Sequence, residues 1–305
     1  MNISQNKKVS VVVPNYNYGK YLKKRVDSIL KQTYPIYELI ILDDASTDGS
    51  VELAKNIVLD LKLKNPEMRV KFVGNTENSG KAMAQWKKGF ELAEGDFVWI
   101  AEADDLCSRH FLEEVMKGFD DPEVVISYAE SMVMNGAGII LTPNFRWSRD
   151  KEKTGHYKKS YVKEGFREIE EIMAIRCTIP NVSGVVFRKS DKIPYLQYLE
   201  EAMRFSQVGD WYFYVKVLAH GRIAYNQKSL NKFRVHHGSK TAESKCDMEH
   251  FREILWMHRF FAVKYNLDEF VTKRVVLEEQ KVAKRMGINN EIMEGIRQEV
   301  AEKGI

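Results

Sequence analysis

The sequence predicts an α/β fold with a mainly parallel sheet flanked by helices, followed by a C-terminal helical appendage. Three observations lead to this fold class. Short β-branched runs alternate with segments of helical periodicity from residue 9 to residue 128, the early strand candidates end in polar residues, and apolar residues recur only at helical spacing after residue 247. Consecutive parallel strands need crossover connections, which helices usually supply.

Length and composition are those of a globular protein. The 305 residues are 44% hydrophobic and 30% charged, which allows a sizeable core in one large domain with an appendage or in two domains. The 47 Lys and Arg against 43 Asp and Glu give a net charge of +4, too mild to indicate a nucleic-acid partner. Cys107, Cys177 and Cys246 lie far apart, so we expect free thiols in a reducing compartment rather than a zinc motif or disulfide framework.

The N-terminal residues argue against secretion. Positions 1–9 are rich in Asn, Gln, Ser and Lys, with no apolar run before the first strand candidate, so no secretory signal is expected. No stretch approaches the roughly 18 apolar residues that a membrane-spanning helix needs. The sequence therefore predicts a cytoplasmic protein, with any membrane contact peripheral to the inner face of the plasma membrane.

In the first part of the chain, strand candidates alternate with helix candidates. The valines at 9–13 predict a first strand that ends at Pro14, because proline lacks the N–H group that a central strand uses. Apolar periodicity predicts a helix from Tyr21 to Leu30, and turn residues at 46–49 precede a second helix. Further strands are predicted at 38–42, 70–73 and 97–100, and a third helix over about 81–92.

The later elements follow the same logic. A helix is predicted over 111–119, strands over 124–128, 182–187 and 223–225, a helix from 206 through 218, and a strand that ends near 235. From residue 247 onward, two helical segments carry apolar faces, one over 248–262 and one over 271–286.

Polar residues stand at the ends of three predicted strands. They occupy positions 14–17, Asp43 with Asp44, and the acidic run at 102–105. Ligands of parallel α/β sheets bind beyond the carboxyl ends of the strands, so these groups are expected to converge on one crevice. Mg²⁺ and Mn²⁺ prefer one or two carboxylates and leave their other positions to water and phosphate, which indicates a nucleotide ligand. The competing interpretation is a solvated acidic turn that caps the next helix.

Three later features each have two interpretations. Asp210 lies in the first turn of a predicted helix, where the macrodipole favours an anion, so capping alone would explain it. His236 and His237 follow a strand beside the suspected cation site and are either ligands or structural residues. The basic, aromatic loop at 144–161 is either a solvated surface loop or a docking site for a phosphate-bearing acceptor.

Six segments in this order resemble the family 2 glycosyltransferases of the GT-A fold. They are VVVPNYN at 11–17, LIILDDASTDG at 39–49, NSG at 78–80, WIAEADD at 99–105, GDW at 209–211 and FRVHHGS at 233–239. The resemblance covers roughly residues 8–239 and implies a Rossmann-like GT-A sheet. It also implies an inverting enzyme that moves a sugar from a nucleotide diphosphate to a hydroxyl acceptor, using Mn²⁺ or Mg²⁺.

The resemblance also suggests how the chain is divided. Residues 1–240 would form the glycosyltransferase domain, with a donor half over about 1–128 and an acceptor half over about 129–240. Residues 241–305 would form a C-terminal helical extension.

For the nucleoside, the resemblance implies residues at two strand ends. Pro14, Tyr16 and Asn17 match the turn beside the base. Asp44, with Asp43 adjacent, matches the carboxylate that hydrogen-bonds uracil. An acceptor carboxylate can read an imide N–H, and the tyrosine ring can pack on the base.

For the phosphates and the cation, the implied residues come from two further segments. Gly80 and Lys81 match the segment that closes over nucleoside and phosphates, where a glycine permits close backbone approach. Glu102, Ala103 and Asp104 match the Asp-x-Asp element, with Glu in place of the commoner first Asp. By this match Asp104 is the metal ligand and Glu102 the ribose contact.

The remaining matches concern the cation and the reaction. His236 matches the late histidine that completes metal or diphosphate binding, and His237 is a substitute for it. Asp210 matches the catalytic base that removes a proton from the acceptor hydroxyl while its oxygen attacks the anomeric carbon. One displacement inverts the configuration, and no matched residue supplies the second acid that a double displacement would need.

The resemblance also implies the partners. They are a nucleotide-sugar donor, with UDP favoured, and a saccharide or lipid-linked saccharide acceptor in bacterial surface polysaccharide or glycan assembly. Nucleic acid is not expected. The C-terminal helices are expected to dock on the sheet domain, and their Lys and Arg residues could instead face a membrane or a second copy of the chain.

Two other functions stay open on the sequence. Another nucleotide-dependent α/β enzyme, such as a dehydrogenase, would need glycines directly after the first strand, where positions 14–17 hold Pro-Asn-Tyr-Asn. A catalytically inactive binding module of the same fold would bind a nucleotide sugar without turnover, although Asp104, Asp210 and His236 are all present.

Overall fold

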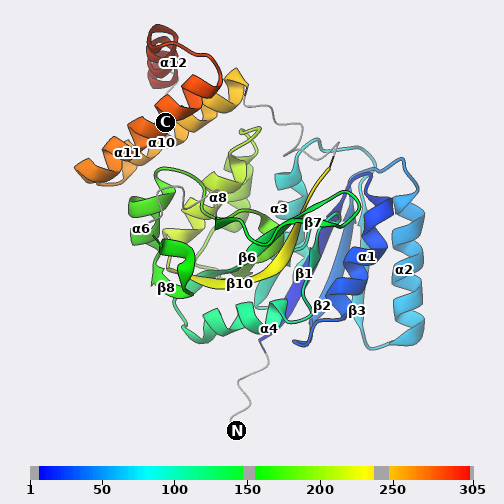
Figure 1. The fold of residues 1–305 in the computed structure, drawn as a ribbon. Coiled ribbons are helices and arrows are strands. Elements are labelled where there is room, and N and C mark those ends of the chain that lie inside the picture. The colour runs from blue at the N-terminus through cyan, green and yellow to red at the C-terminus, as the bar shows by residue number, and fades with distance from the viewer. Residues whose placement is uncertain (1–6, 147–154, 237–246, 303–305) are drawn as a thin grey trace.

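A single ten-stranded mixed sheet forms the centre of the computed structural model, which describes residues 7–146, 155–236 and 247–302 (Figure 1). The order of its main strands is β3-β2-β1-β4-β9-β6-β10-β5, with β7 paired to β6 and β8 to β10. The strands are β1 (Val9–Asn15), β2 (Glu38–Asp43), β3 (Arg69–Gly74), β4 (Phe97–Ile100), β5 (Leu106–Cys107), β6 (Val124–Asn135), β7 (Ile140–Thr142), β8 (Tyr161–Glu164), β9 (Val185–Arg188) and β10 (Arg222–Val235).

The parallel part of the sheet lies in the first half of the chain. Strands β3, β2, β1 and β4 are all parallel, as the alternation of strands and helices predicts. Strand β9 then runs antiparallel between β4 and β6, and β6 and β10 return to parallel pairing. The predicted α/β class is confirmed, with antiparallel pairings added in the second half of the chain.

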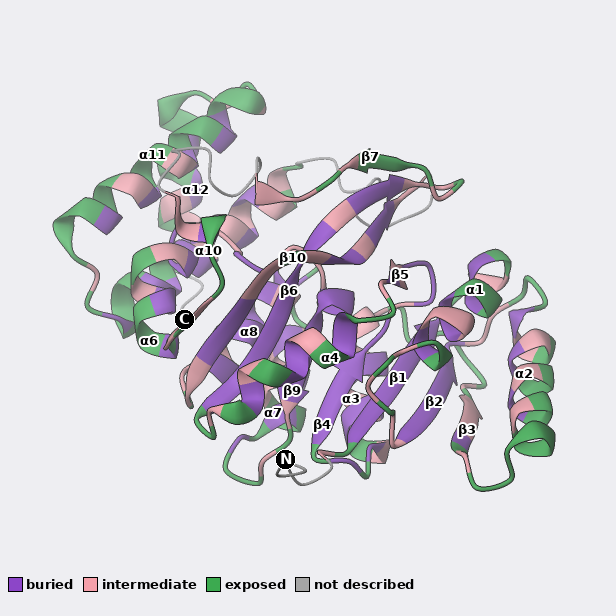
Figure 2. Ribbon diagram, turned by 60° about the horizontal axis from the view of Figure 1, so that its bottom comes forward, coloured by how far each residue is buried: buried purple, intermediate pink, exposed green. Residues whose placement is uncertain are grey.

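Helices cover both faces of the sheet. They are α1 (Gly19–Leu30), α2 (Ser50–Lys64), α3 (Ala82–Leu92), α4 (Phe111–Met116), α6 (Gly165–Glu168), α7 (Tyr195–Ala202), α8 (Gly209–Leu218), α10 (Met248–Lys264), α11 (Glu269–Arg285) and α12 (Asn290–Glu302). Strand β1 shows the period-two alternation that creates two cores. Val11 and Val13 pack with α1, α2 and α4, whereas Val12 packs with α3, α7 and α8. The central strands β1, β2 and β4 are accordingly buried along their whole length between helical layers (Figure 2).

The first strand is longer than predicted, because β1 continues through Pro14 to Asn15. Pro14 pairs with Leu42 of β2, and its carbonyl accepts the N–H of Ala103 at 3.2 Å. That carbonyl points toward the β4 side, where β4 has ended at Ile100. The missing N–H of proline therefore removes no bond from the β1–β2 ladder.

The C-terminal helices pack against the sheet domain. In Figure 1 the pair α10 and α11 lies beside α8, with α12 on its outer side. Met257, Phe260 and Phe261 of α10 belong to the same buried cluster as α8, and a second, smaller cluster holds α10, α11 and α12 together. Among the helices of the described ranges, none combines the length and the apolar composition that a membrane span requires.

The predictions for the cysteines and for two later segments can be compared with the described residues only in part. Cys107 and Cys177 are free thiols, as expected, whereas Cys246 and His237 lie outside the described residues. Residues 147–154 of the basic, aromatic loop at 144–161 also lie outside them.

Candidate active site

A cavity of about 800 Å³ opens at the carboxyl ends of β1 and β4. The strand order reverses here, because β2 and β3 lie on one side of β1 and β4 lies on the other. Open α/β sheets bind ligands at such switch points. Asp44, Asp104 and Asp210 all line this cavity, so the expected convergence of distant acids is observed.

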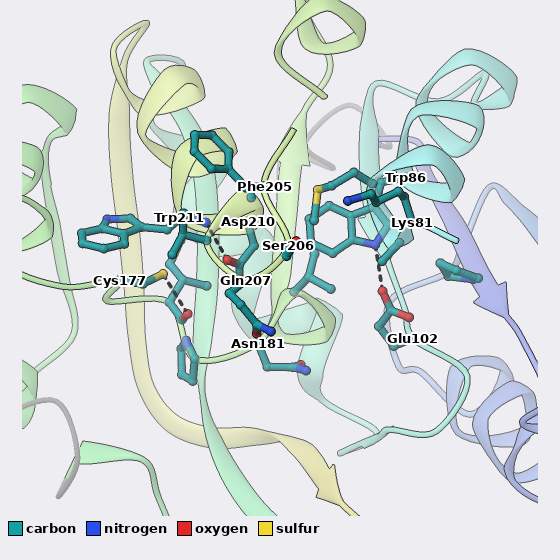
Figure 3. Close-up of a pocket in the computed structure, with 18 of the residues that line it drawn as sticks. Lys81, Trp86, Glu102, Cys177, Asn181, Phe205, Ser206, Gln207, Asp210 and Trp211 are labelled. Atoms are coloured by element: carbon teal, nitrogen blue, oxygen red, sulfur yellow. Dashed lines mark hydrogen bonds between the residues drawn. The ribbon is translucent and has the colours of Figure 1, made fainter. Parts of the chain in front are cut away.

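Two walls of the cavity face each other in Figure 3. Lys81, Trp86 and Glu102 lie on one side, and Asp210 and Trp211 lie on the other. The cavity therefore lies between the segments at 81–102 and the segment that begins α8.

The turn after β1 is held by buried side-chain hydrogen bonds. Asn15 donates from Nδ2 to Asp43 Oδ2 at 2.6 Å, and the Asp43 carboxylate also accepts the N–H and hydroxyl of Ser46, each at 2.8 Å. Asn17 adopts a left-handed φ of 57°, which Asn tolerates better than most residues. Its Oδ1 accepts the N–H of Thr47 at 2.8 Å. Asp43 is thereby fully buried and shapes the turn, whereas Pro14 and Tyr16 line the cavity.

Asp44 lines the cavity through a carboxylate that accepts several hydrogen bonds. Asn75 Nδ2 donates at 2.6 Å, Ser79 donates from its N–H at 3.0 Å and its hydroxyl at 2.7 Å, and Gln85 Nε2 donates at 2.8 Å. These donors come from the end of β3, the following loop and α3. The side chain is therefore fixed at the cavity wall, with its oxygens as hydrogen-bond acceptors.

The loop before α3 supplies Gly80 and Lys81 to the same wall. Gly80 has a φ of 69°, a left-handed conformation that glycine adopts without strain. Lys81 is the N-cap residue of α3, so its extended backbone places the ammonium-bearing side chain beside a helix N-terminus. Both features favour an anion in this part of the cavity.

Glu102 extends into the cavity from the end of β4. Its Oε1 accepts the indole N–H of Trp86 at 2.8 Å, and its backbone N–H donates to Ser183 Oγ at 3.1 Å. Burial, followed by the neighbouring Asp104 carboxylate, raises the pKa of Glu102 to about 8. Ala103 is fully buried, and its N–H bonds to Pro14, so it joins β1 to the acidic segment instead of lining the cavity.

Asp104 and His236 meet across the chain. Asp104 Oδ2 lies 3.1 Å from His236 Nε2, although 132 positions separate the two residues. Tyr18 and Tyr21 hold the imidazole, with ring centroids 5.4 Å and 5.3 Å away. Strand β10 thus delivers the predicted histidine to the predicted aspartate.

Arg234 fixes the acidic segment from behind. Its backbone N–H donates to Asp105 Oδ1 at 2.8 Å, and its guanidinium Nε donates to the Asp104 carbonyl at 2.5 Å. Burial and the Asp104 charge raise the pKa of Asp105 to about 7, against the opposing effect of Arg25. The segment therefore holds two carboxyl groups, those of Glu102 and Asp105, whose ionised forms are disfavoured.

The residues present fit a divalent cation of the magnesium kind. In the ranges 7–146, 155–236 and 247–302 no three His, Cys, Asp or Glu side chains are grouped to enclose a metal on their own. The Asp104–His236 pair offers one carboxylate and one imidazole beside the cavity. Mg²⁺ and Mn²⁺ sites with few protein ligands take their other ligands from water and phosphates.

Asp210 is the second residue of α8 and lines the cavity. Its Oδ1 accepts the N–H of Trp211 at 2.7 Å, and among the described residues no side chain donates to the carboxylate. Burial raises the pKa of Asp210 to about 6, although two backbone N–H groups lower it in part. A carboxylate with this pKa is ionised at neutral pH and is a stronger base than an exposed aspartate.

Several residues of the site were not expected from the sequence. Gln85 and Trp86 lie on the buried face of α3, where helical periodicity indicates core residues. The only sign of a site in the sequence is that the Gln85 amide and the Trp86 indole N–H are polar groups on a buried helix face. Such groups need hydrogen-bond partners. Described parts of the 144–161 loop are packed: Arg146 donates to the Gln227 carbonyl at 2.8 Å, and Tyr157 is buried beside Tyr225.

This sheet, with carboxylates around a cavity at its switch point, defines an α/β protein with a candidate ligand site beyond the carboxyl ends of the strands. The chain matches the model of glycosyl transferase family 2 over residues 10–176, more than half of its length, and it belongs to that family. This is the family that the sequence motifs predict.

Its relatives include bacterial glycosyltransferases. The chain is 37% identical over 120 residues to glycosyltransferase GlyG of Streptococcus pneumoniae serotype 4, in an alignment that covers 39% of this chain and 38% of GlyG. It is 34% identical over 111 residues to poly(ribitol-phosphate) beta-N-acetylglucosaminyltransferase TarP of Staphylococcus aureus, in an alignment that covers 36% of this chain and 32% of TarP. These alignments span less than half the length of either relative.

Solved structures share the fold over almost the whole chain. Staphylococcus aureus TarS 1–349 in complex with UDP-GlcNAc aligns with a TM-score of 0.63 at 18% identity, covering 96% of this chain and 79% of that one. The mannosyltransferase PcManGT from Pyrobaculum calidifontis, in complex with GDP-Man and Mn²⁺, aligns with a TM-score of 0.55 at 19% identity, covering 97% and 73%. The GT-A fold is confirmed, including the C-terminal helices.

Proposed function

We propose that the chain is an inverting glycosyltransferase that moves a sugar from a nucleotide diphosphate donor, with UDP favoured, to a hydroxyl of a saccharide or lipid-linked saccharide. The setting we propose is bacterial surface polysaccharide assembly, in keeping with the TarP relative. One observation carries the proposal: Asp44, Asp104 and Asp210 come from distant segments and line one cavity.

Asp44 is the proposed contact for the base. Its carboxylate is held as an acceptor at the cavity wall by Asn75, Ser79 and Gln85. Uracil presents an imide N–H donor to such a group, which adenine does not. The complex of TarS with UDP-GlcNAc supports a uridine nucleotide, whereas that of PcManGT with GDP-Man shows that the fold also accepts guanosine.

The diphosphate would lie between two positively polarised features. Lys81 and the N-terminus of α3 are one such feature at the cavity wall, and Asp104 with His236 would supply the other by holding Mn²⁺ or Mg²⁺. When bound, the cation would offset the negative charge that develops on the departing diphosphate. Glu102, whose side chain is anchored by Trp86, is the proposed ribose contact.

Asp210 is the proposed general base. Its Oδ1 is engaged by the Trp211 N–H, which leaves Oδ2 to accept a proton from the acceptor hydroxyl. The hydroxyl oxygen forms a bond to the anomeric carbon as the bond from that carbon to the diphosphate oxygen breaks. Because attack and departure occur on opposite faces in one step, the anomeric configuration inverts.

Asp210→Asn tests this assignment. Asparagine keeps an oxygen for the Trp211 N–H but cannot take a proton, so transfer is expected to fall by a factor on the order of 10²–10⁴. Binding of UDP, measured by calorimetry with Mn²⁺, is expected to stay within about twofold of the wild type. Turnover near the wild-type rate, measured as released UDP and glycosylated product, would remove Asp210 from the base role.

A further inference from the structure

Glu253 of α10 is bonded to the loop that leads into α8. Its carboxylate accepts three consecutive backbone N–H groups, from Ser206 at 2.6 Å, Gln207 at 2.8 Å and Val208 at 3.1 Å. The side chain belongs to the C-terminal helices, yet it is only 6% exposed because it lies beneath this loop.

The same loop is also packed on α10 through aromatic contacts. The ring of Phe205 lies 5.0 Å from that of Trp256, and the Arg204 guanidinium lies 4.2 Å from the same indole. Residues 204–208 are therefore attached to α10 at two points, one polar and one aromatic. In contrast, α8 receives no N-cap bond from the side chain of Val208, its own N-cap residue.

Successive N–H groups that point to one side form a concave site for an anion, and the N-terminus of a helix adds positive polarisation. Glu253 fills this site from within the molecule. Its two oxygens satisfy all three donors. The Val208 N–H is buried, so the loss of its partner would carry a free-energy cost that favours rearrangement of the loop. The conformation of residues 206–208 thus depends on a carboxylate in the C-terminal helices.

Asp210 follows Val208 by two positions, and Ser206, Gln207 and Val208 line the same cavity as Asp210. Figure 3 shows Ser206 and Gln207 beside Asp210 at the cavity wall. A shift of this loop therefore moves the first turn of α8 and the carboxylate it carries.

We propose that Glu253 is a positioning residue for the transfer reaction. It holds the loop at 206–208, and that loop determines the position of the Asp210 carboxylate. This role rests on the base function proposed for Asp210. It makes the C-terminal helices part of the reaction machinery, since the acid that fixes the loop comes from α10. Misplacement of a reacting group by about 1 Å lowers rates by around 10²-fold.

Glu253→Gln tests the proposal at nearly constant volume. An amide has one acceptor oxygen, and its NH₂ group would face a backbone donor, so at least one of the three bonds is lost. We expect kcat to fall by roughly 10–100-fold, with an unchanged Kd for UDP and an unchanged KM for the donor. Glu249→Gln is the matched control, because Glu249 lies one turn earlier in α10, is 62% exposed and does not touch the loop.

A second variant separates positioning from general stabilisation. Glu253→Ala leaves space for a small carboxylate, so added formate is expected to raise the kcat of this variant. Formate should not raise the kcat of the wild type or of Glu249→Gln. The assays are run at a temperature where circular dichroism finds every variant folded. No increase with formate, or a wild-type kcat in Glu253→Gln, would overturn the proposal.

Asp210→Asn, assayed in parallel, distinguishes the two failures. If Asp210→Asn loses transfer while Glu253→Gln retains it, only the role of Glu253 is wrong. If Asp210→Asn retains transfer, the base assignment itself fails, and the Glu253 proposal falls with it.

Discussion

At the scale of single residues, the cavity concentrates acids that burial makes costly. Glu102 and Asp105 both have a raised pKa, to about 8 and about 7, because water is excluded and Asp104 stands between them. Such crowding destabilises the fold when no cation is bound, and functional sites commonly carry this kind of cost. The cluster of acids at 102–105 is therefore better explained by the binding of a ligand than by a contribution to the stability of the fold.

Asp210 allows this cost to be measured. Its pKa is about 6 in the folded chain against an ordinary value of 3.8, so the folded state binds the proton more tightly than the unfolded state. Stability is therefore lost as the pH rises from about 4 to about 6, and the loss persists above that range. We expect Asp210→Asn to raise the free energy of unfolding at pH 8 by about 1–3 kcal/mol.

The comparison with low pH supplies the control for that measurement. Near pH 4 the wild-type carboxyl of Asp210 is protonated when the chain is folded, so most of the difference from Asp210→Asn should vanish. Urea unfolding at both pH values gives the two free energies. An Asn variant that is less stable than the wild type at pH 8 would show that the ionised carboxylate stabilises the fold.

The sequence could predict only part of the site. Asp44 and Asp104 are predictable because they follow apolar runs at strand ends, where topology alone brings side chains together. Gln85 and Glu253 lie inside helices, and their partners are 41 and 45–47 positions away. No local pattern encodes such contacts, since they depend on how two helices pack.

At the scale of elements, periodicity predicted most helices and strands but not how far some of them extend. The segments expected as strands near 223–225 and 235 are one strand, β10, which continues past register shifts in its pairing with β6. Its middle, at 226–229, holds Asn, Gln, Lys and Ser, residues that lack strand propensity. Tertiary pairing therefore overrides local preference in this strand.

Helix α3 has a close approach to the sheet that can be tested. A Cβ added at Gly89 would lie 2.6 Å from Val12 Cγ1 in the central strand β1, which cannot move without disturbing both cores. Gly89→Ala is therefore expected to lower the free energy of unfolding by roughly 1–2 kcal/mol, because overpacking outweighs the gain in helix propensity. The change is read from urea unfolding.

Gly295→Ala is the control for the same substitution in a helix. Gly295 lies within α12, and a Cβ there would meet no atom within 4 Å. Only helix propensity should act, so a gain of roughly 0.5–1 kcal/mol is expected. If Gly89→Ala were stabilised as much as Gly295→Ala, the α3–β1 contact would be looser than the structure indicates.

At the scale of the whole molecule, the C-terminal helices share a core with the sheet domain. Trp211 of α8 lies 5.6 Å from Phe261 and 5.9 Å from His258, both in α10. His258 in turn bonds to Glu279 of α11 at 3.0 Å and to the carbonyl of Ile175 at 3.2 Å. We therefore propose that the regions 1–240 and 241–305 unfold as one unit, although their sequences differ in character.

Truncation after residue 240 tests this unity. The shortened chain would expose the face of α8 that packs on Phe260 and Phe261, and the N–H groups of residues 206–208 would lose Glu253. Each buried aromatic side chain contributes about 1.5–3 kcal/mol of hydrophobic free energy, so the fragment is expected to melt well below the full chain or to aggregate. Removal of α12 alone should cost less, because α12 packs in the smaller cluster with α10 and α11. Calorimetry of the full chain should give one transition. A truncated chain that melts at the same temperature as the full chain would mean that the C-terminal extension does not stabilise the sheet domain.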